Sequence, residues 1–165
     1  MSYFYFAYGS NMNPARVKAR GIDYQHLLPG RLDNYRLHFN KRASGKEGVA
    51  YANITYCHGS VVEGVLYRLP SPQTIHVMDP FEGHPVRYRR ETLSIKTAAG
   101  LEAAWVYLAN RHVIADKLLP ERSYLNHLLA GRSLYSEAYH QWLLSHECIE
   151  VDSTDSSVNC LVHNA

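Results

Sequence analysis

The sequence predicts an α+β fold, a small mixed β-barrel with helices packed outside it. Seven runs rich in aromatic and β-branched residues alternate with Gly, Pro, Asn and Asp, a pattern typical of strands, whereas helical patterns are fewer. In the run 102–108, alternate residues are apolar on both faces, which predicts a strand that is buried on both sides. A closed or nearly closed sheet with outer helices satisfies this burial, and a two-layer sandwich with one solvated face does not.

The predicted strands, in chain order, are 3–8, 25–28, 35–39, 49–55, 61–69, 88–95 and 102–108. The last two are separated by the short segment 98–100, whose Gly100 readily adopts positive φ, so they are predicted to form a hairpin. The run 88–95 alternates poorly, and which of its faces is buried stays open.

Four helices are predicted, namely 14–20, a second from Ser71-Pro72 toward Met78, 119–130, and a fourth that begins after Ser136. The first two share a start signal, because a capping Asn or Ser precedes a Pro whose missing N–H would have no partner in the first turn. Gly131 lies just past the third helix, a position typical of a helix end. Apolar residues recur at the helical period after Ser136 and indicate a stripe that faces the core.

The turn after the first predicted strand is the main candidate for a ligand site. Gly9 allows a tight bend, and Ser10 and Asn11 are short polar residues that tolerate unusual dihedral angles. Main-chain N–H groups in such a bend can converge on a carboxylate or a phosphate, and the start of the next helix would lie close by. The alternative is an ordinary strand-to-helix turn that binds nothing, because the same residues are common wherever a chain reverses.

Length and composition indicate one ordinary globular domain. A chain of 165 residues is long enough to bury a core without disulfides, and its 46% hydrophobic and 19% charged residues are typical of globular proteins. The net charge of +2 is too small to predict a nucleic-acid partner, and no basic stripe with interleaved aromatic residues occurs. Lys41, Arg42 and Lys46 are interpreted as part of a solvated loop.

The cysteines and histidines predict neither a disulfide framework nor a metal site. Cys57, Cys148 and Cys160 are odd in number and widely spaced, which favours a reducing, cytoplasmic location. The 10 histidines form no HxxxH or HxH pair, so no metal is expected. The N-terminus lacks the pattern of a signal peptide, and no segment approaches the roughly 20 apolar residues that span a bilayer, so we expect an unprocessed soluble protein with no membrane partner.

Four separated segments carry a common pattern: Tyr5–Met12, Gly48–Ala50, Glu63–Tyr67, and Asp79–Gly83 followed by Tyr88. Together they resemble the γ-glutamylcyclotransferase family, which includes γ-glutamylcyclotransferase-like and AIG2-like proteins. Weaker similarity continues in Tyr107-Leu108 and in 124–131, and the resemblance extends to about Trp142. It predicts a γ-glutamylcyclotransferase-like domain over 1–146 and a C-terminal tail over 147–165 that is extended or flexible.

The resemblance implies the γ-glutamylcyclotransferase-like barrel fold and an enzyme, a lyase or transferase. Its small-molecule substrate would be a γ-glutamyl amino acid or amine, cyclised to 5-oxoproline with release of the free amine and without a cofactor. In the family, the glutamate that matches Glu82 is catalytic. The residues implied to bind the substrate are Tyr8, Gly9, Ser10, Asn11, Met12, Tyr88, Tyr107 and Tyr124.

The residue types suit this reaction. The substrate's α-amine attacks its own side-chain amide, so the enzyme has to hold two groups of one molecule about 3–3.5 Å apart. An amine with a pKa near 8 is mostly protonated at neutral pH, and the Glu82 carboxylate would take its proton and return one to the departing nitrogen. Partial burial raises the pKa of a carboxyl and would suit both steps. The turn 9–12 would hold the glutamyl carboxylate.

Alternative interpretations stay open for these residues. Glu82 would otherwise be a solvated acid in a turn, and the tyrosines would be core residues whose hydroxyls pair internally. Arg87, Arg89 and Arg90 form either a solvated edge or a group in which one arginine meets an acidic leaving group, and Arg16 has the same two interpretations.

The sequence does not identify the released half of the substrate, and the loop after Gly83 is shorter than the family pattern. A second possible function is a non-catalytic module that binds a carboxylated metabolite on the same fold. Nucleotide binding is disfavoured because neither a GxGxxG motif nor a P-loop lysine accompanies the glycine turn. A monomer and a homodimer are both open.

Overall fold

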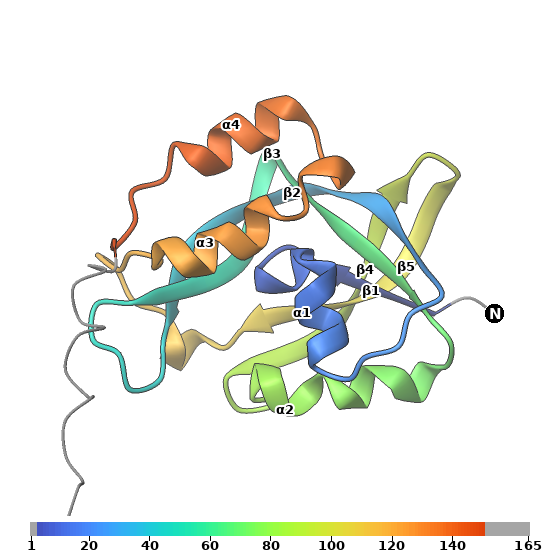
Figure 1. Cartoon of the computed structure of the whole chain (residues 1–165), viewed down its shortest axis with the longest axis horizontal. Coiled ribbons are helices and arrows are strands. Elements are labelled where there is room, and N and C mark those ends of the chain that lie inside the picture. The colour runs from blue at the N-terminus through green and yellow to red at the C-terminus, as the bar shows by residue number, and fades with distance from the viewer. Residues whose placement is uncertain (1–2, 151–165) are drawn as a thin grey trace, which may run out of the picture.

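The computed structural model describes residues 3–150 and confirms the predicted α+β barrel (Figure 1). The strands are β1 Tyr3–Ala7, β2 His26–Arg42, β3 Ala50–Leu69, β4 Tyr88–Thr97 and β5 Gly100–Ala109. They form a closed barrel in the order β1-β3-β2-β4-β5. β1 is antiparallel to β3 but parallel to β5, so the barrel closes through one parallel pair and its sheet is mixed.

Two of the predicted strand breaks are bulges inside longer strands. The runs 25–28 and 35–39 belong to β2, and the runs 49–55 and 61–69 belong to β3. Asn34 and Gly59 both have positive φ, at 62° and 79°, and the Gly59 N–H donates a 3.0 Å hydrogen bond to the Asn34 side chain. Between the pairs Asp33↔Val61 and Tyr35↔Tyr56, one residue of β2 stands opposite four of β3, so these turn-forming residues lie in an irregularity within the paired ladder instead of ending it.

The second hairpin has the predicted form. β4 and β5 pair from Tyr88↔Ala109 to Thr97↔Gly100, so the turn lies at 98–99. The expectation that β5 is buried on both faces holds for its second half, where Val106–Ala109 are all buried, while Ala103 nearer the turn is exposed.

The helical segments are η1 Ser10–Met12, α1 Pro14–Ala19, η2 Pro72–Val77, α2 Asp79–Glu82, η3 Arg111–Val113, α3 Arg122–Leu129, η4 Arg132–Leu134 and α4 Glu137–Leu144. Two predicted caps are present, because Asn13 accepts from the Ala15 N–H at 3.1 Å and Ser136 accepts from the Tyr139 N–H at 3.2 Å. The predicted second helix is instead a 3₁₀ helix followed by the short α2. Figure 1 shows α3 and α4 on one side of the barrel and α2 on the opposite side.

The helix ends differ from the prediction in one detail. Gly131 follows α3, but its φ is −82°, so it does not form a left-handed helix end. A Cβ atom there would lie 3.0 Å from the Met12 carbonyl oxygen, so this glycine allows α3 to approach the turn after β1.

The predicted tail begins at 147, and Ile149 still forms a bridge with Glu121 at the start of α3. The remainder of the tail, from 151 on, lies outside the described residues.

Candidate active site

The turn after β1 and the short helix α2 meet at one cavity. Its wall is formed by Tyr5, Phe6, Tyr8, Gly9, Ser10, Asn11, Ala52, Glu82, Tyr88, Tyr107 and Tyr124. The cavity has a volume of about 40 Å³, which is small for a site that binds a small molecule. All the residues predicted to form the site lie in this wall except Met12, which is fully buried beneath the turn.

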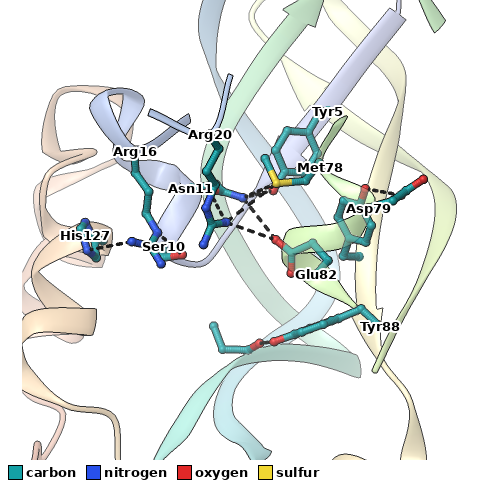
Figure 2. Close-up of polar contacts among 12 residues, drawn as sticks. Tyr5, Ser10, Asn11, Arg16, Arg20, Met78, Asp79, Glu82, Tyr88 and His127 are labelled. Carbon is teal, nitrogen blue, oxygen red and sulfur yellow. Dashed lines mark hydrogen bonds and ion pairs between the residues drawn. The ribbon is translucent and has the colours of Figure 1, made fainter. Parts of the chain in front are cut away.

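Gly9 is needed for close approach and not for positive φ. Its φ is −111°, but a Cβ atom would lie 3.1 Å from the Tyr124 hydroxyl and 3.2 Å from the Ala52 Cβ. The 3₁₀ turn η1 follows at once, and the first N–H groups of such a turn have no partner within it. Arg16 on α1 donates to the Ser10 hydroxyl at 3.1 Å, which places a positive charge behind the turn (Figure 2).

Glu82 presents a shielded carboxyl to this cavity. It is the last residue of α2, which ends because Gly83 adopts a left-handed conformation with φ 62°. The side chain of Glu82 is 17% exposed, and its Oε1 accepts a hydrogen bond from Asn11 Nδ2 at 3.3 Å and lies 3.9 Å from Arg20 Nη1. Burial raises the pKa of Glu82, and the charges of Arg20 and Lys41 oppose this rise without cancelling it.

Asn11, itself part of the cavity wall, holds the carboxyl of Glu82 in place. Its Nδ2 lies 2.8 Å from the Tyr5 hydroxyl, 3.2 Å from Met78 Sδ and 3.3 Å from Glu82 Oε1, while its Oδ1 accepts from Arg20 Nη1 at 3.0 Å (Figure 2). Asn11 is 3% exposed, so these contacts replace water almost completely. The amide therefore links the turn, α1 and α2 around one carboxyl group.

The other acid of α2, Asp79, faces away from the turn. It accepts a 2.7 Å hydrogen bond from the Tyr107 hydroxyl, and its oxygens lie 3.1 Å from Arg90 Nε and 3.1 Å from His76 Nδ1. Burial would raise the pKa of Asp79, but the hydrogen bonds from Tyr107 and His76 and the charge of Arg90 outweigh burial and lower it. Asp79 and Glu82, three residues apart, thus have pKa values shifted in opposite directions.

The four predicted site tyrosines all use their hydroxyls inside the protein. Tyr8 donates to the Tyr107 carbonyl, Tyr88 donates to the Ala52 carbonyl at 2.7 Å, and Tyr124 accepts from the Ala52 N–H at 3.0 Å. Burial raises the pKa of Tyr8, Tyr88 and Tyr124, so these phenols are neutral at physiological pH. They form flat cavity walls while they tie together the strands and α3.

The three arginines around β4 have separate environments. Arg89 pairs with Glu91 at the surface, as expected for a solvated edge. Arg90 is held in the ion pair with Asp79, and its guanidinium lies 4.8 Å from the centre of the Trp105 ring. Arg87 donates only to uncharged oxygens, those of the Ser44 hydroxyl and the Arg42 backbone. Arg90 is therefore structural, while the charge of Arg87 has no acidic partner among residues 3–150.

Lys41 was expected in a solvated loop, and this expectation is wrong. β2 continues beyond Phe39 through a bulge, so Lys41 lies on a strand and is 4% exposed. Its Nζ lies 5.0 Å from the centre of the Tyr51 ring and 5.2 Å from that of Tyr88. Burial lowers the pKa of Lys41 to about 8, and the charge of Arg87 contributes to the decrease. The error arose because the predicted strand ended at Phe39, whereas β2 continues to Arg42.

Two searches of the described residues were negative. No helix within 3–150 is long and apolar enough to cross a membrane. Over the same range, His, Cys, Asp and Glu side chains do not gather in any group of three or more that could hold a metal ion.

The protein is thus a small closed barrel with one tyrosine-lined cavity, at which a glycine turn and a shielded carboxyl meet. The family model described as gamma-glutamyl cyclotransferase, AIG2-like, matches residues 5–126, and the chain belongs to that family. This confirms the resemblance seen in the sequence and supports an enzyme of the cyclotransferase type. No curated protein is similar enough in sequence to count as a match.

Solved structures share the fold at low sequence identity. A protein described as a gamma-glutamyl cyclotransferase is 21% identical, with a TM-score of 0.77 and 95% coverage of both chains. An uncharacterised protein from Homo sapiens is 22% identical, with a TM-score of 0.77 and coverage of 90% of this chain and 89% of the other. A yeast gamma-glutamyl cyclotransferase described as specific to glutathione is 12% identical, with a TM-score of 0.64 and coverage of 87% and 94%.

Proposed function

We propose that this chain is a γ-glutamyl cyclotransferase that converts a small γ-glutamyl amino acid or amine to 5-oxoproline and the free amine. Family membership supports the type of enzyme. The observation that carries the proposal is the shared cavity, because the glycine turn and Glu82 are remote in the sequence yet line one small space. A single small molecule there would contact both.

In the proposed complex the turn binds the glutamyl end of the substrate. The start of η1 offers backbone N–H groups, and Arg16 and Arg20 add positive charge on the same side of the cavity. The tyrosine walls exclude water and restrict the flexible substrate, so its amine stays close to its own side-chain amide. Such positioning supplies much of the acceleration in a reaction within one molecule.

Glu82 is the proposed general base and acid. It takes a proton from the substrate ammonium and releases it to solvent, and the freed amine forms a new C–N bond to the amide carbonyl carbon. Glu82 then takes the second proton from this nitrogen and passes it to the departing nitrogen, so the original C–N bond breaks and the amine leaves in its neutral form. A carboxyl with a raised pKa suits both transfers, because it accepts a proton readily and still releases it.

The alternative function is a non-catalytic module that binds a carboxylated metabolite. A module that only binds has no use for a carboxyl with a raised pKa at the cavity, whereas the enzyme uses this carboxyl for proton transfer, which favours the enzyme. The alternative gains support if the purified protein forms no 5-oxoproline but is thermally stabilised by a γ-glutamyl compound.

The decisive experiment compares the native protein with Glu82→Gln, which keeps the size of the side chain and removes the base. With a panel of γ-glutamyl amino acids and amines, 5-oxoproline and free amine are quantified by chromatography. We expect kcat to fall by about 10²–10⁴-fold. The matched control is Glu91→Gln, which removes an exposed acid of β4 and should leave turnover unchanged. Native turnover by Glu82→Gln would refute the assigned role.

We also propose that the enzyme works in the cytoplasm. Cys57 and Cys148 are free thiols, which suits a reducing compartment. The third cysteine, Cys160, lies outside the described residues.

A further inference from the structure

Lys41 is a buried lysine that forms no ion pair among residues 3–150, and the acid that acts on its charge from a distance is Glu82 at the cavity. The residue is 4% exposed, and its ammonium group makes neither an ion pair nor a hydrogen bond with any side chain in that range. Its close neighbours are the faces of the Tyr51 and Tyr88 rings, at 5.0 and 5.2 Å. Burying an unpaired charge is costly, and an apolar side chain of similar length would fill the same space without that cost. A counter-charge supplied from outside the protein would offset it.

The position of Lys41 relates it to the proposed active site. Tyr88, which its ammonium contacts, is part of the cavity wall, and Tyr51 packs against Tyr124, another wall residue, with 4.9 Å between ring centres. Figure 2 shows Tyr88 on the opposite side of Glu82 from Asn11. Lys41 therefore lies beside the cavity, next to the wall that Tyr88 forms.

Neighbouring cations strengthen the positive field on this side. Arg87 packs against Gly83, directly after Glu82, because a Cβ on Gly83 would lie 3.0 Å from Arg87 Cδ. The guanidinium of Arg87 donates only to uncharged oxygens, and that of Arg42 donates to the His112 carbonyl. Two groups of cations thus flank Glu82. Arg16 and Arg20 lie on the side of the turn, and Lys41 lies on the side of Tyr88 together with Arg42 and Arg87.

We propose that Lys41 binds the carboxylate of the amino acid that is released, so that the preferred substrates are γ-glutamyl amino acids and not γ-glutamyl amines. This inference rests on the proposed function and assigns the half of the substrate that the turn does not bind. A γ-glutamyl amino acid has a carboxylate at each end and the reacting amide between them. The groups around the cavity have the matching order, with the cations and N–H groups of the turn, then Glu82 in the wall, then Lys41 next to the wall residue Tyr88 and supported by Arg87.

The test uses two substrates that differ only in this carboxylate, γ-glutamylalanine and γ-glutamylethylamide. For the native protein we expect kcat/KM to be about 10- to 100-fold higher for γ-glutamylalanine, the range of a hydrogen bond to a charged group. Lys41→Met should remove this preference by slowing γ-glutamylalanine alone, while Lys41→Arg should keep most of it. Lys46→Met, which removes an exposed lysine bound to Glu121, is the matched control and should change nothing.

The possible outcomes separate this inference from the proposed function. Equal turnover of the two substrates by the native protein overturns the inference alone, whereas no 5-oxoproline from either overturns the proposed function and the inference with it. If Lys41→Met slows both substrates by the same factor, Lys41 acts on Glu82 or on the fold and the inference is wrong. If Lys41→Met fails to fold, as judged by circular dichroism, the native protein and Lys41→Arg provide the test. A ratio near one between the kcat/KM values for the two substrates, in either protein, contradicts the inference.

Discussion

Replacing Asn11 with alanine is expected to destabilise the fold, because this buried amide joins three elements. The substitution removes the partner of the Tyr5 hydroxyl, which lies 2.8 Å away in a residue that is 4% exposed. It also removes the acceptor of Arg20, although Glu82 remains 3.9 Å from that guanidinium and would take over part of the contact. A buried polar group left unpaired costs about 1–3 kcal/mol, so we expect a loss of about 2–4 kcal/mol in the free energy of unfolding.

The same substitution should change the pH dependence of the proposed activity. The hydrogen bond from Asn11 lowers the pKa of Glu82, so its loss moves that pKa further above the ordinary value. Because Glu82 must be ionised to accept a proton, the acid limb of the kcat/KM profile should move to higher pH. Urea unfolding at 25 °C measures the first effect, and a pH–rate profile with a γ-glutamyl amino acid measures the second.

Asn13→Ala is the matched control, two residues away and of the same residue type. It removes the cap of α1, whose hydrogen bond to the Ala15 N–H is 3.1 Å long, and should cost about 0.5–2 kcal/mol. It should not move the acid limb, because Asn13 makes no contact with Glu82. An Asn11→Ala protein with native stability, or with the acid limb in its native position, would show that Asn11 does not hold Glu82 in the way described.

Two further predictions concern the charge of Glu82 and the barrel interior. The folded-state pKa of Glu82 is raised above its ordinary 4.5, so its stability contribution is present below pH 4.5 and lost as the pH rises through the folded pKa. Glu82→Gln should therefore raise Tm at neutral pH and lose this advantage below about pH 4.5, and an equal gain at both pH values would contradict the shift. A Cβ on Gly64 would lie 2.3 Å from the Ala7 carbonyl, whereas one on Gly30 would meet only side chains, with Ile95 and Phe6 both at 2.9 Å. Gly64→Ala should therefore cost about 3 kcal/mol or more by denaturant unfolding. Adding Phe6→Leu should restore more stability to Gly30→Ala than to Gly64→Ala, so equal rescue would be evidence against this account.

The sequence predicted correctly those features that depend on residues close together in the chain. The caps at Asn13 and Ser136 lie where the sequence predicts them, because a cap is formed by residues within one turn. The β4–β5 hairpin was predictable for the same reason. Asn34 and Gly59 resemble loop residues in the sequence, yet they face each other inside a ladder, and only the pairing of β2 with β3 reveals them as bulge residues.

The site residues predicted from the sequence line the cavity, apart from Met12, but the contacts among them were not predicted. The family pattern identified Glu82 and the turn, whereas the role of Asn11 as the amide that holds Glu82 follows from packing between α1, α2 and β1. The burial of Lys41 was missed because the predicted strand ended at Phe39. The sequence did contain a signal, since Leu37 and Phe39 continue at period two to Lys41, but a lysine in that position reads as the end of a strand.

The position of Glu82 depends on an acid that does not line the cavity. A helix of four residues such as α2 is too short to be stable by itself, so contacts with the barrel must fix it. Asp79 provides them through Tyr107 on β5 and Arg90 on β4, and these partners keep Asp79 ionised while burial raises the pKa of Glu82. Two carboxyls on one helix turn thus receive opposite environments, the arrangement that separates a structural acid from one suited to proton transfer. The barrel strands, through Asp79, therefore set the distance between Glu82 and the turn that would hold the substrate.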